Sequence, residues 1–158
     1  MENYLDTHTH VTNFPCGATP CAMPAQCPLQ ILVIDHENGP AHTLIDVLSR
    51  VFGPRVSYIL ADDESTVQYV LACCEPELIV AGLDARAINI LALLPDIRST
   101  YRTLPILAVG RHVSCFTQEE SHQFGADEVL ELPYRAAELK SLVVTLAQRY
   151  LQPAGSAA

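Results

Sequence analysis

Five short apolar segments, each followed by a stretch with helical spacing, constrain most strongly what this chain can fold into. Each segment is too short for a typical helix and is apolar along most of its length, which is typical of a strand buried on both faces. The predicted strands are 29–34, 56–60, 78–83, 105–109 and 128–132. The predicted helices are 41–52, 64–74, 88–101, 118–124 and 136–151. Pro95 predicts either a kink in the third helix or a break that leaves this proline in a first turn.

Strands that alternate with helices in this way indicate a parallel sheet with helices on both faces. Right-handed crossovers leave few topologies, and the commonest for five units is the flavodoxin-like strand order 2-1-3-4-5. We therefore predict one α/β domain, a doubly wound (βα)5 sheet, over residues 29–151. Residues 1–28 contain four prolines and no periodic apolar pattern, which predicts an irregular N-terminal arm. Residues 152–158 have the composition of a C-terminal tail or linker.

Charge and composition exclude several classes of function. The 18 acidic and 9 basic residues give a formal net charge of −9, which repels nucleic-acid phosphates and anionic lipids. We therefore expect no direct binding to nucleic acid or to membranes. No apolar run approaches the roughly 20 residues of a membrane-spanning helix, and the first residues lack the pattern of a signal peptide. We expect a cytoplasmic protein whose cysteines are reduced, because a chain of this length can build a core without disulfides.

The carboxyl ends of the predicted strands are where functional groups gather in a doubly wound sheet. In this chain they read Asp35-His36-Glu37, Gly82-Leu83-Asp84, Gly110-Arg111-His112 and Leu132-Pro133-Tyr134. Further segments are Ile31-Leu32-Val33-Ile34-Asp35, Pro76-Glu77-Leu78-Ile79-Val80, Leu104-Pro105-Ile106-Leu107 and Gly125-Ala126-Asp127-Glu128-Val129-Leu130. With these segments, the chain resembles response-regulator receiver domains over about residues 29–151.

The resemblance implies five functional positions, and four of them are changed here. A receiver has an acidic pair after the first strand, a phosphoacceptor aspartate ending the third, a threonine or serine ending the fourth, and a lysine after the fifth. The corresponding residues of this chain are Asp35 and His36, Gly82, Gly110 and Leu132. Phosphoryl transfer to a carboxylate needs that carboxylate as nucleophile and a Mg²⁺ ion held by oxygen ligands. We therefore predict a domain that is not phosphorylated, is not an enzyme and holds no metal or cofactor, with Asp84 as the alternative, displaced acceptor.

A receiver-like framework without an acceptor indicates a module that works by binding proteins. The resemblance implies homodimerisation through the fourth helix, fifth strand and fifth helix. The residues predicted for this dimer or partner face are Glu128, Tyr134, Arg135, Lys140 and Arg149. Among atypical receivers, the chain is similar to the N-terminal domain of σ54-dependent flagellar master regulators. That likeness implies a role in bacterial transcriptional regulation and a AAA+ activator as effector or partner.

The alternative function is a small-ligand, metal or redox sensor that uses the strand-end cleft or the N-terminal arm. Thiolate and imidazole are the usual ligands of zinc, and the arm carries His8, His10, Cys16, Cys21 and Cys27. We expect Cys73 and Cys74 to be packing thiols, because a vicinal pair rarely forms an unstrained disulfide. Cys115 is expected in an exposed loop. His36 either fills the vacated cleft or forms a pH-sensitive contact with its acidic neighbours.

Overall fold

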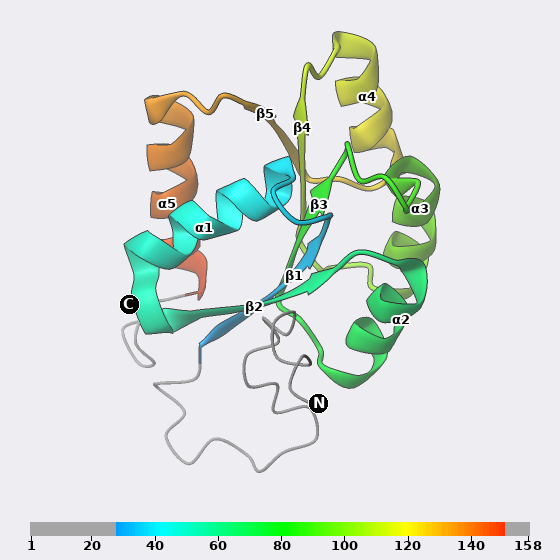
Figure 1. Cartoon of the computed structure of the whole chain (residues 1–158), viewed down its shortest axis with the longest axis horizontal. Helices are drawn as coiled ribbons and strands as arrows, with labels where there is room; N and C mark the ends of the chain where they lie inside the picture. Colours follow the sequence, from blue (N-terminus) through cyan, green and yellow to red (C-terminus); the bar gives the residue numbers. More distant parts are fainter. Residues whose placement is uncertain (1–27, 151–158) are drawn as a thin grey trace, which may run out of the picture.

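The computed structural model describes residues 28–150, in which five parallel strands form one sheet. The strands are β1 (Leu29–Ile34), β2 (Val56–Ala61), β3 (Leu78–Gly82), β4 (Ile106–Arg111) and β5 (Glu128–Leu132). Their order in the sheet is β2-β1-β3-β4-β5, and every neighbouring pair is parallel. The predicted fold class and strand order are therefore confirmed (Figure 1).

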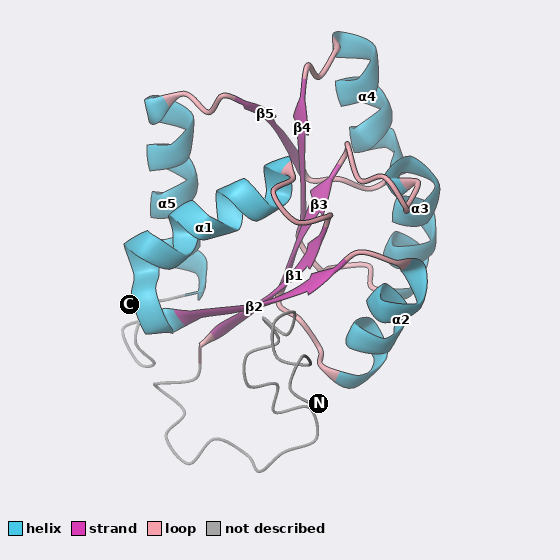
Figure 2. Cartoon of the chain, viewed as in Figure 1, coloured by secondary structure: helices cyan, strands magenta, loops and turns pink. Residues whose placement is uncertain are grey.

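Helices cover both faces of this sheet, as Figure 2 shows, and each face has its own core. The helices are α1 (Pro40–Phe52), α2 (Glu64–Cys73), α3 (Ile90–Thr100), α4 (Cys115–Phe124) and α5 (Ala136–Tyr150), with the short 3-10 helix η3 (Gly53–Arg55) after α1. Alternate residues of β1 enter opposite cores: Val33 packs with α1 and α5, and Leu32 packs with α2 and α3. A strand enclosed in this way is apolar along most of its length, and this is the pattern from which β1 was predicted.

Two helices differ from their predicted course. The helix α4 begins at Cys115 and not at Gln118, because the Ser114 hydroxyl accepts a hydrogen bond from the Thr117 amide at 3.0 Å and caps the earlier start. In α3, Pro95 lies inside the helix beyond its first turn, so the predicted break before it is wrong. In the part of the chain from 28 to 150, no helix is both long and apolar enough to cross a lipid bilayer.

Candidate functional site at the carboxyl ends of the strands

The parallel register brings the carboxyl ends of the strands to one edge of the sheet. Ile34 at the end of β1 pairs with Ala81, and Gly82 at the end of β3 pairs with Val109. Arg111, which ends β4, pairs with Leu132, which ends β5. The positions predicted from the resemblance therefore meet at this edge, which we call the strand-end cleft.

Asp35 is fully buried in the cleft, at 0% exposure. Its carboxylate accepts hydrogen bonds from the amides of His36 and Ala41, each at 2.8 Å. Ala41 belongs to the first turn of α1, and the residue at the N-cap of that helix, Gly39, has no side chain that could cap it. Asp35 therefore caps α1 from the preceding loop, and the positive end of the helix dipole stabilises its negative charge.

The carboxylate of Asp35 also fills the space where a side chain at position 82 would begin. A Cβ atom built on Gly82 would lie 2.5 Å from both Cγ and Oδ2 of Asp35, far inside van der Waals contact. A Cβ atom on Gly39 would lie 2.3 Å from the same carboxylate oxygens. Position 82, which the resemblance places at the acceptor site, thus has no side chain, and the space beside it is occupied by the Asp35 carboxylate.

The remaining changed positions are also enclosed by neighbouring side chains. A Cβ atom on Gly110 would lie 3.0 Å from Cγ2 of Val113 and 3.2 Å from Cβ of Leu83, so these two side chains cover the end of β4. Leu132 is half-buried, and the peptide bond between Leu132 and Pro133 is cis. Neither residue offers a hydroxyl or an ammonium group to the cleft.

His36 packs against the Asp35 carboxylate without a clear hydrogen bond. Its Nδ1 atom lies 3.0 Å from Oδ1 of Asp35, a distance suited to an ion pair. The same buried nitrogen has no hydrogen-bond partner of acceptable geometry. A hydrogen bond weakens steeply when it is bent, so the short distance alone does not make one. Both predicted roles of His36, as a filler and as a pH-sensitive contact, therefore stay open.

Tyr134 is half-buried between the β5–α5 loop and the start of α1. Its hydroxyl donates a hydrogen bond to the carbonyl oxygen of Pro40 at 2.9 Å. Burial, and secondarily the charge of Asp35, raise the pKa of Tyr134 well above its ordinary value, so the phenol stays protonated as a donor. The hydroxyl of this residue is thus directed inward, toward the cleft.

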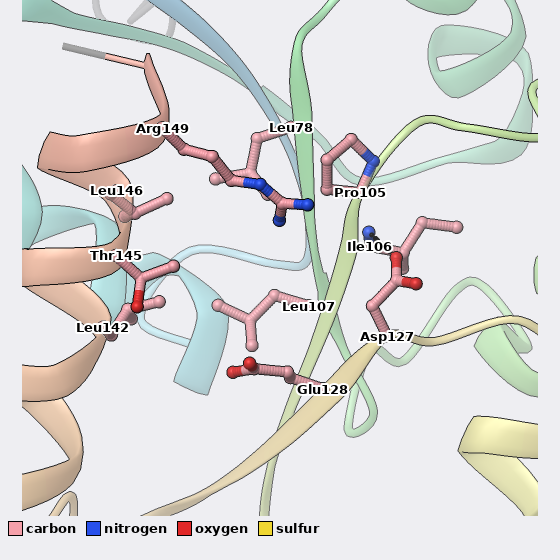
Figure 3. A pocket seen from close by; sticks show the side chains of 10 residues that line it. All are labelled: Leu78, Pro105, Ile106, Leu107, Asp127, Glu128, Leu142, Thr145, Leu146 and Arg149. Carbon is pink, nitrogen blue, oxygen red and sulfur yellow. Dashed lines mark hydrogen bonds between the residues drawn. The ribbon is translucent and has the colours of Figure 1, made fainter. Parts of the chain in front are cut away.

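The other four residues of the predicted dimer or partner face are exposed on β5, α5 and the loop between them; they are Glu128, Arg135, Lys140 and Arg149. Two of them, Glu128 and Arg149, line a cavity of about 60 Å³ between α5 and the amino ends of β3, β4 and β5. Figure 3 shows Arg149 reaching from α5 across this cavity, whose wall is made of apolar side chains such as Leu107 and Leu146.

Asp84, the predicted displaced acceptor, is exposed, and its Oδ2 atom accepts a hydrogen bond from the Arg111 amide at 2.9 Å. Within residues 28–150, no three His, Cys, Asp or Glu side chains gather as they would around a metal ion. The predicted ligands His8, His10, Cys16, Cys21 and Cys27 lie outside the described residues.

None of the three cysteines in the described part of the chain forms a disulfide bond. Cys74 packs against the core under α2 and α3. Cys73 is exposed, so its prediction as a packing thiol is wrong; successive residues at a helix end point to different sides. Cys115 is exposed, as expected, but it belongs to the first turn of α4 and not to the preceding loop.

Two residues of the cleft were missed by the reasoning from sequence. Gly39 is packed against Asp35, and Glu131 of β5 accepts a hydrogen bond from the Val113 amide at 2.7 Å. Pro40 signals a helix start at this point, but nothing local shows that the glycine before it touches a buried carboxylate.

A five-stranded parallel sheet in this order, covered by helices on both faces, is the flavodoxin-like fold of a receiver-like domain. No protein-family model matches the sequence, and no curated protein matches it either. Solved structures do match. The signal receiver domain of the DNA-binding response regulator merR from Colwellia psychrerythraea 34H has a TM-score of 0.66 at 18% identity, covering 77% of this chain and 99% of that one.

Two further similar structures have the same fold. The receiver domain of NtrX from Brucella abortus has a TM-score of 0.59 at 25% identity, with 77% of this chain and 97% of that chain covered. HP1043, an orphan response regulator of H. pylori, has a TM-score of 0.59 at 18% identity, with 78% and 97% covered. These likenesses support the receiver-like fold.

Proposed function

We propose that this receiver-like domain is a signalling module that does not accept a phosphoryl group and acts by binding other proteins. The observation that carries the proposal is the contact between Asp35 and Gly82, where a carboxylate occupies the place of the missing acceptor. In a receiver that is phosphorylated, this place must hold a free nucleophile beside a metal ion. In this chain the place is filled by the Asp35 carboxylate, which caps α1.

The surrounding groups support the same conclusion. Asp35 cannot turn toward a metal ion without giving up the amide of Ala41, which is buried and would lose its partner. Leu132 supplies no positive charge to pair with an aspartyl phosphate. Asp84 is held against the end of β4, because its Oδ2 atom accepts a hydrogen bond from the Arg111 amide.

Intact-mass measurement after incubation with acetyl phosphate and Mg²⁺ tests this part of the proposal. We expect no phosphoryl adduct, under conditions in which a receiver domain that retains its acceptor aspartate is modified. The Asp84→Asn variant is the matched control, because it removes the displaced acceptor and leaves the cleft intact. A stoichiometric adduct on the unaltered chain that Asp84→Asn abolishes would overturn the proposal.

The protein contacts that we propose are a homodimer and an effector docked on the face formed by α4, β5 and α5. Glu128 on β5 is acidic, whereas Arg135 and Lys140 at the start of α5 are basic, and all three are exposed. In a two-fold dimer the same face meets itself in reverse, so charges of opposite sign at its two ends can pair across the interface. The net charge of −9 supports a protein partner over nucleic acid or an anionic membrane.

Sedimentation velocity at tens of micromolar tests the dimer. We expect Lys140→Glu to weaken it and Lys140→Glu with Glu128→Lys to restore it, whereas Gln68→Glu on α2 leaves it unchanged. A strictly monomeric chain with which no protein co-purifies would remove the support for an interaction module.

The partner class that we propose is a AAA+ σ54 activator in bacterial transcriptional regulation. Its support is the resemblance of the chain to the N-terminal domains of such regulators. A second observation is that a match to NtrX from Brucella abortus, at 24% identity and a TM-score of 0.61, covers only 27% of that chain. In that protein the receiver is thus one part of a longer regulator. Reconstituted binding between this chain and a AAA+ activator module, measured by calorimetry, tests the assignment.

A further inference from the structure

Three loops at the strand-end cleft are joined to one another and to β5 by hydrogen bonds in which side chains take part. Asp84, after β3, accepts a hydrogen bond from the amide of Arg111 at 2.9 Å. The Arg111 guanidinium donates to the carbonyl oxygen of Asn38, in the loop before α1, at 3.2 Å. Glu131 of β5 accepts a hydrogen bond from the amide of Val113 at 2.7 Å. These contacts link the loops that follow β1, β3 and β4 to each other and to β5.

Arg111 is central to this set of contacts, because it bonds through its backbone on one side and through its side chain on the other. Its positive charge also acts on the cleft, where it opposes the upward shift that burial and Asp35 impose on the pKa of Tyr134. An arginine keeps its charge at any pH of interest and donates in fixed directions. It therefore places a permanent positive charge at the cleft.

The contacts also fix the segment that leads into α4. Val113 covers Gly110 at 3.0 Å from where a Cβ atom would lie, so the loop folds back over the end of β4. The first turn of α4 follows at once and presents Phe116, which is 69% exposed. Holding residues 111–114 in place thus holds this aromatic side chain on the surface, where an apolar anchor suits protein binding.

We infer that Arg111 holds the cleft and the start of α4 permanently in one state, in place of a switch that depends on phosphorylation. This inference rests on the proposed function and specifies its regulation: the binding surface is presented constitutively. The hydrogen bonds of Asp84, Glu131 and Asn38 fix the conformation that a phosphorylated receiver would reach only when its phosphoryl group is present.

Hydrogen–deuterium exchange of the full chain tests the inference. In Arg111→Ala, we expect the amides of residues 36–41 and 111–117 to exchange about tenfold faster, as suits the loss of one hydrogen bond from a charged donor. Asp84→Ala is the second variant and should loosen 111–117 by a similar factor. Arg86→Ala is the matched control, because it removes an exposed arginine from the same β3–α3 loop and should leave both segments unchanged.

A further sample separates this inference from the proposed function. Acetyl phosphate with Mg²⁺, added to the unaltered chain, should leave exchange at 111–117 as it was. A change caused by the phosphodonor would overturn the proposed function. If Arg111→Ala and Asp84→Ala both exchange like Arg86→Ala while the phosphodonor has no effect, the proposed function stands and the role given to Arg111 is wrong.

Discussion

Alanine substitutions at Gly82 and Asp35, made separately and together, test whether the buried carboxylate occupies the place of the residue-82 side chain. In Gly82→Ala, a methyl carbon would begin 2.5 Å from Cγ and Oδ2 of Asp35, so the carboxylate or the strand has to shift. Overpacking a core costs about 1–3 kcal/mol. A shifted carboxylate also weakens its bond from the Ala41 amide, and bonds to charged groups contribute about 1.5–3 kcal/mol. We expect Gly82→Ala to lower the free energy of unfolding by about 2–4 kcal/mol.

Asp35→Ala removes the acceptor of two amides and leaves the Ala41 N–H buried without a partner. Leaving the buried Ala41 amide without its partner, which is also the loss of the α1 cap, costs about 1–3 kcal/mol, and the lost bond from the His36 amide adds about 1 kcal/mol, so this variant should lose about 2–4 kcal/mol. In the double variant, the methyl group at position 82 meets no carboxylate, and the second substitution costs little. The summed losses of the single variants should therefore exceed the loss of the double variant by about 1–3 kcal/mol.

Urea unfolding followed by circular dichroism at pH 7 measures this coupling, provided that the dependence on denaturant is the same in all variants. The control pairs Asp35→Ala with Gly53→Ala. Gly53 has a φ of 59° and no atom within 4 Å of an added Cβ, so its substitution is strained but independent of the cleft. If the losses at positions 35 and 82 add to within about 0.5 kcal/mol, like those of the control pair, the packing argument is refuted.

Three further predictions concern contacts outside that pair. Arg98 donates a hydrogen bond to the Gly125 carbonyl oxygen at 2.6 Å, and its side chain is mostly buried, so Arg98→Ala should lower the free energy of unfolding in urea by about 2–3 kcal/mol. Arg98→Lys should not recover this stability, because lysine lacks the forked donor. Tyr134→Phe removes the bond to Pro40 and should cost about 1 kcal/mol. Burial raises the pKa of Tyr134 in the folded state, so the stability contributed by its protonated hydroxyl is complete below the ordinary pKa of 10.0 and is lost as the pH rises beyond it. Tyr134→Phe should therefore reduce the loss of stability at alkaline pH. The hydrogen bond from the Thr66 amide lowers the pKa of Asp63, the N-cap residue of α2, so the charged cap stabilises the helix above the ordinary pKa of 3.8 and this stabilisation is lost on acidification. Asp63→Asn should keep part of the cap and make stability less dependent on pH in the acid range.

The fold could be predicted from the sequence because burial on both faces leaves a direct trace in it. All five residues of β3 are buried, and the segment 78–83 is correspondingly apolar. The start of α4 was placed late because residues 115–117 add no apolar spacing, although Ser114 is a residue type that favours the N-cap. With Ser114 as the N-cap, the sequence predicts the observed start of α4 at Cys115.

The candidate site could be predicted only as a set of positions. Gly82 and Gly110 were placed at the strand ends because the end of an apolar run is visible in sequence. The contact of Asp35 with Gly82 and Gly39 depends on a side-chain rotamer and on the close approach of two loops. Neither leaves a local pattern, so the filling of the cleft became visible only in the folded chain.

Because the Asp35 carboxylate occupies the space beside Gly82, an aspartate at position 82 and a lysine at position 132 should not make the chain accept a phosphoryl group. In Gly82→Asp with Leu132→Lys, the new aspartate would begin in contact with the Asp35 carboxylate, and two carboxylates cannot both stay charged at that distance without a cation between them. To admit a metal ion, Asp35 would have to release the amide of Ala41 and so uncap α1. We therefore expect this double variant to be less stable than the unaltered chain and to show no adduct with acetyl phosphate and Mg²⁺ by intact mass. A stoichiometric adduct at position 82 would show that Asp35 gives way easily, and that the cleft lacks only its acceptor and its lysine.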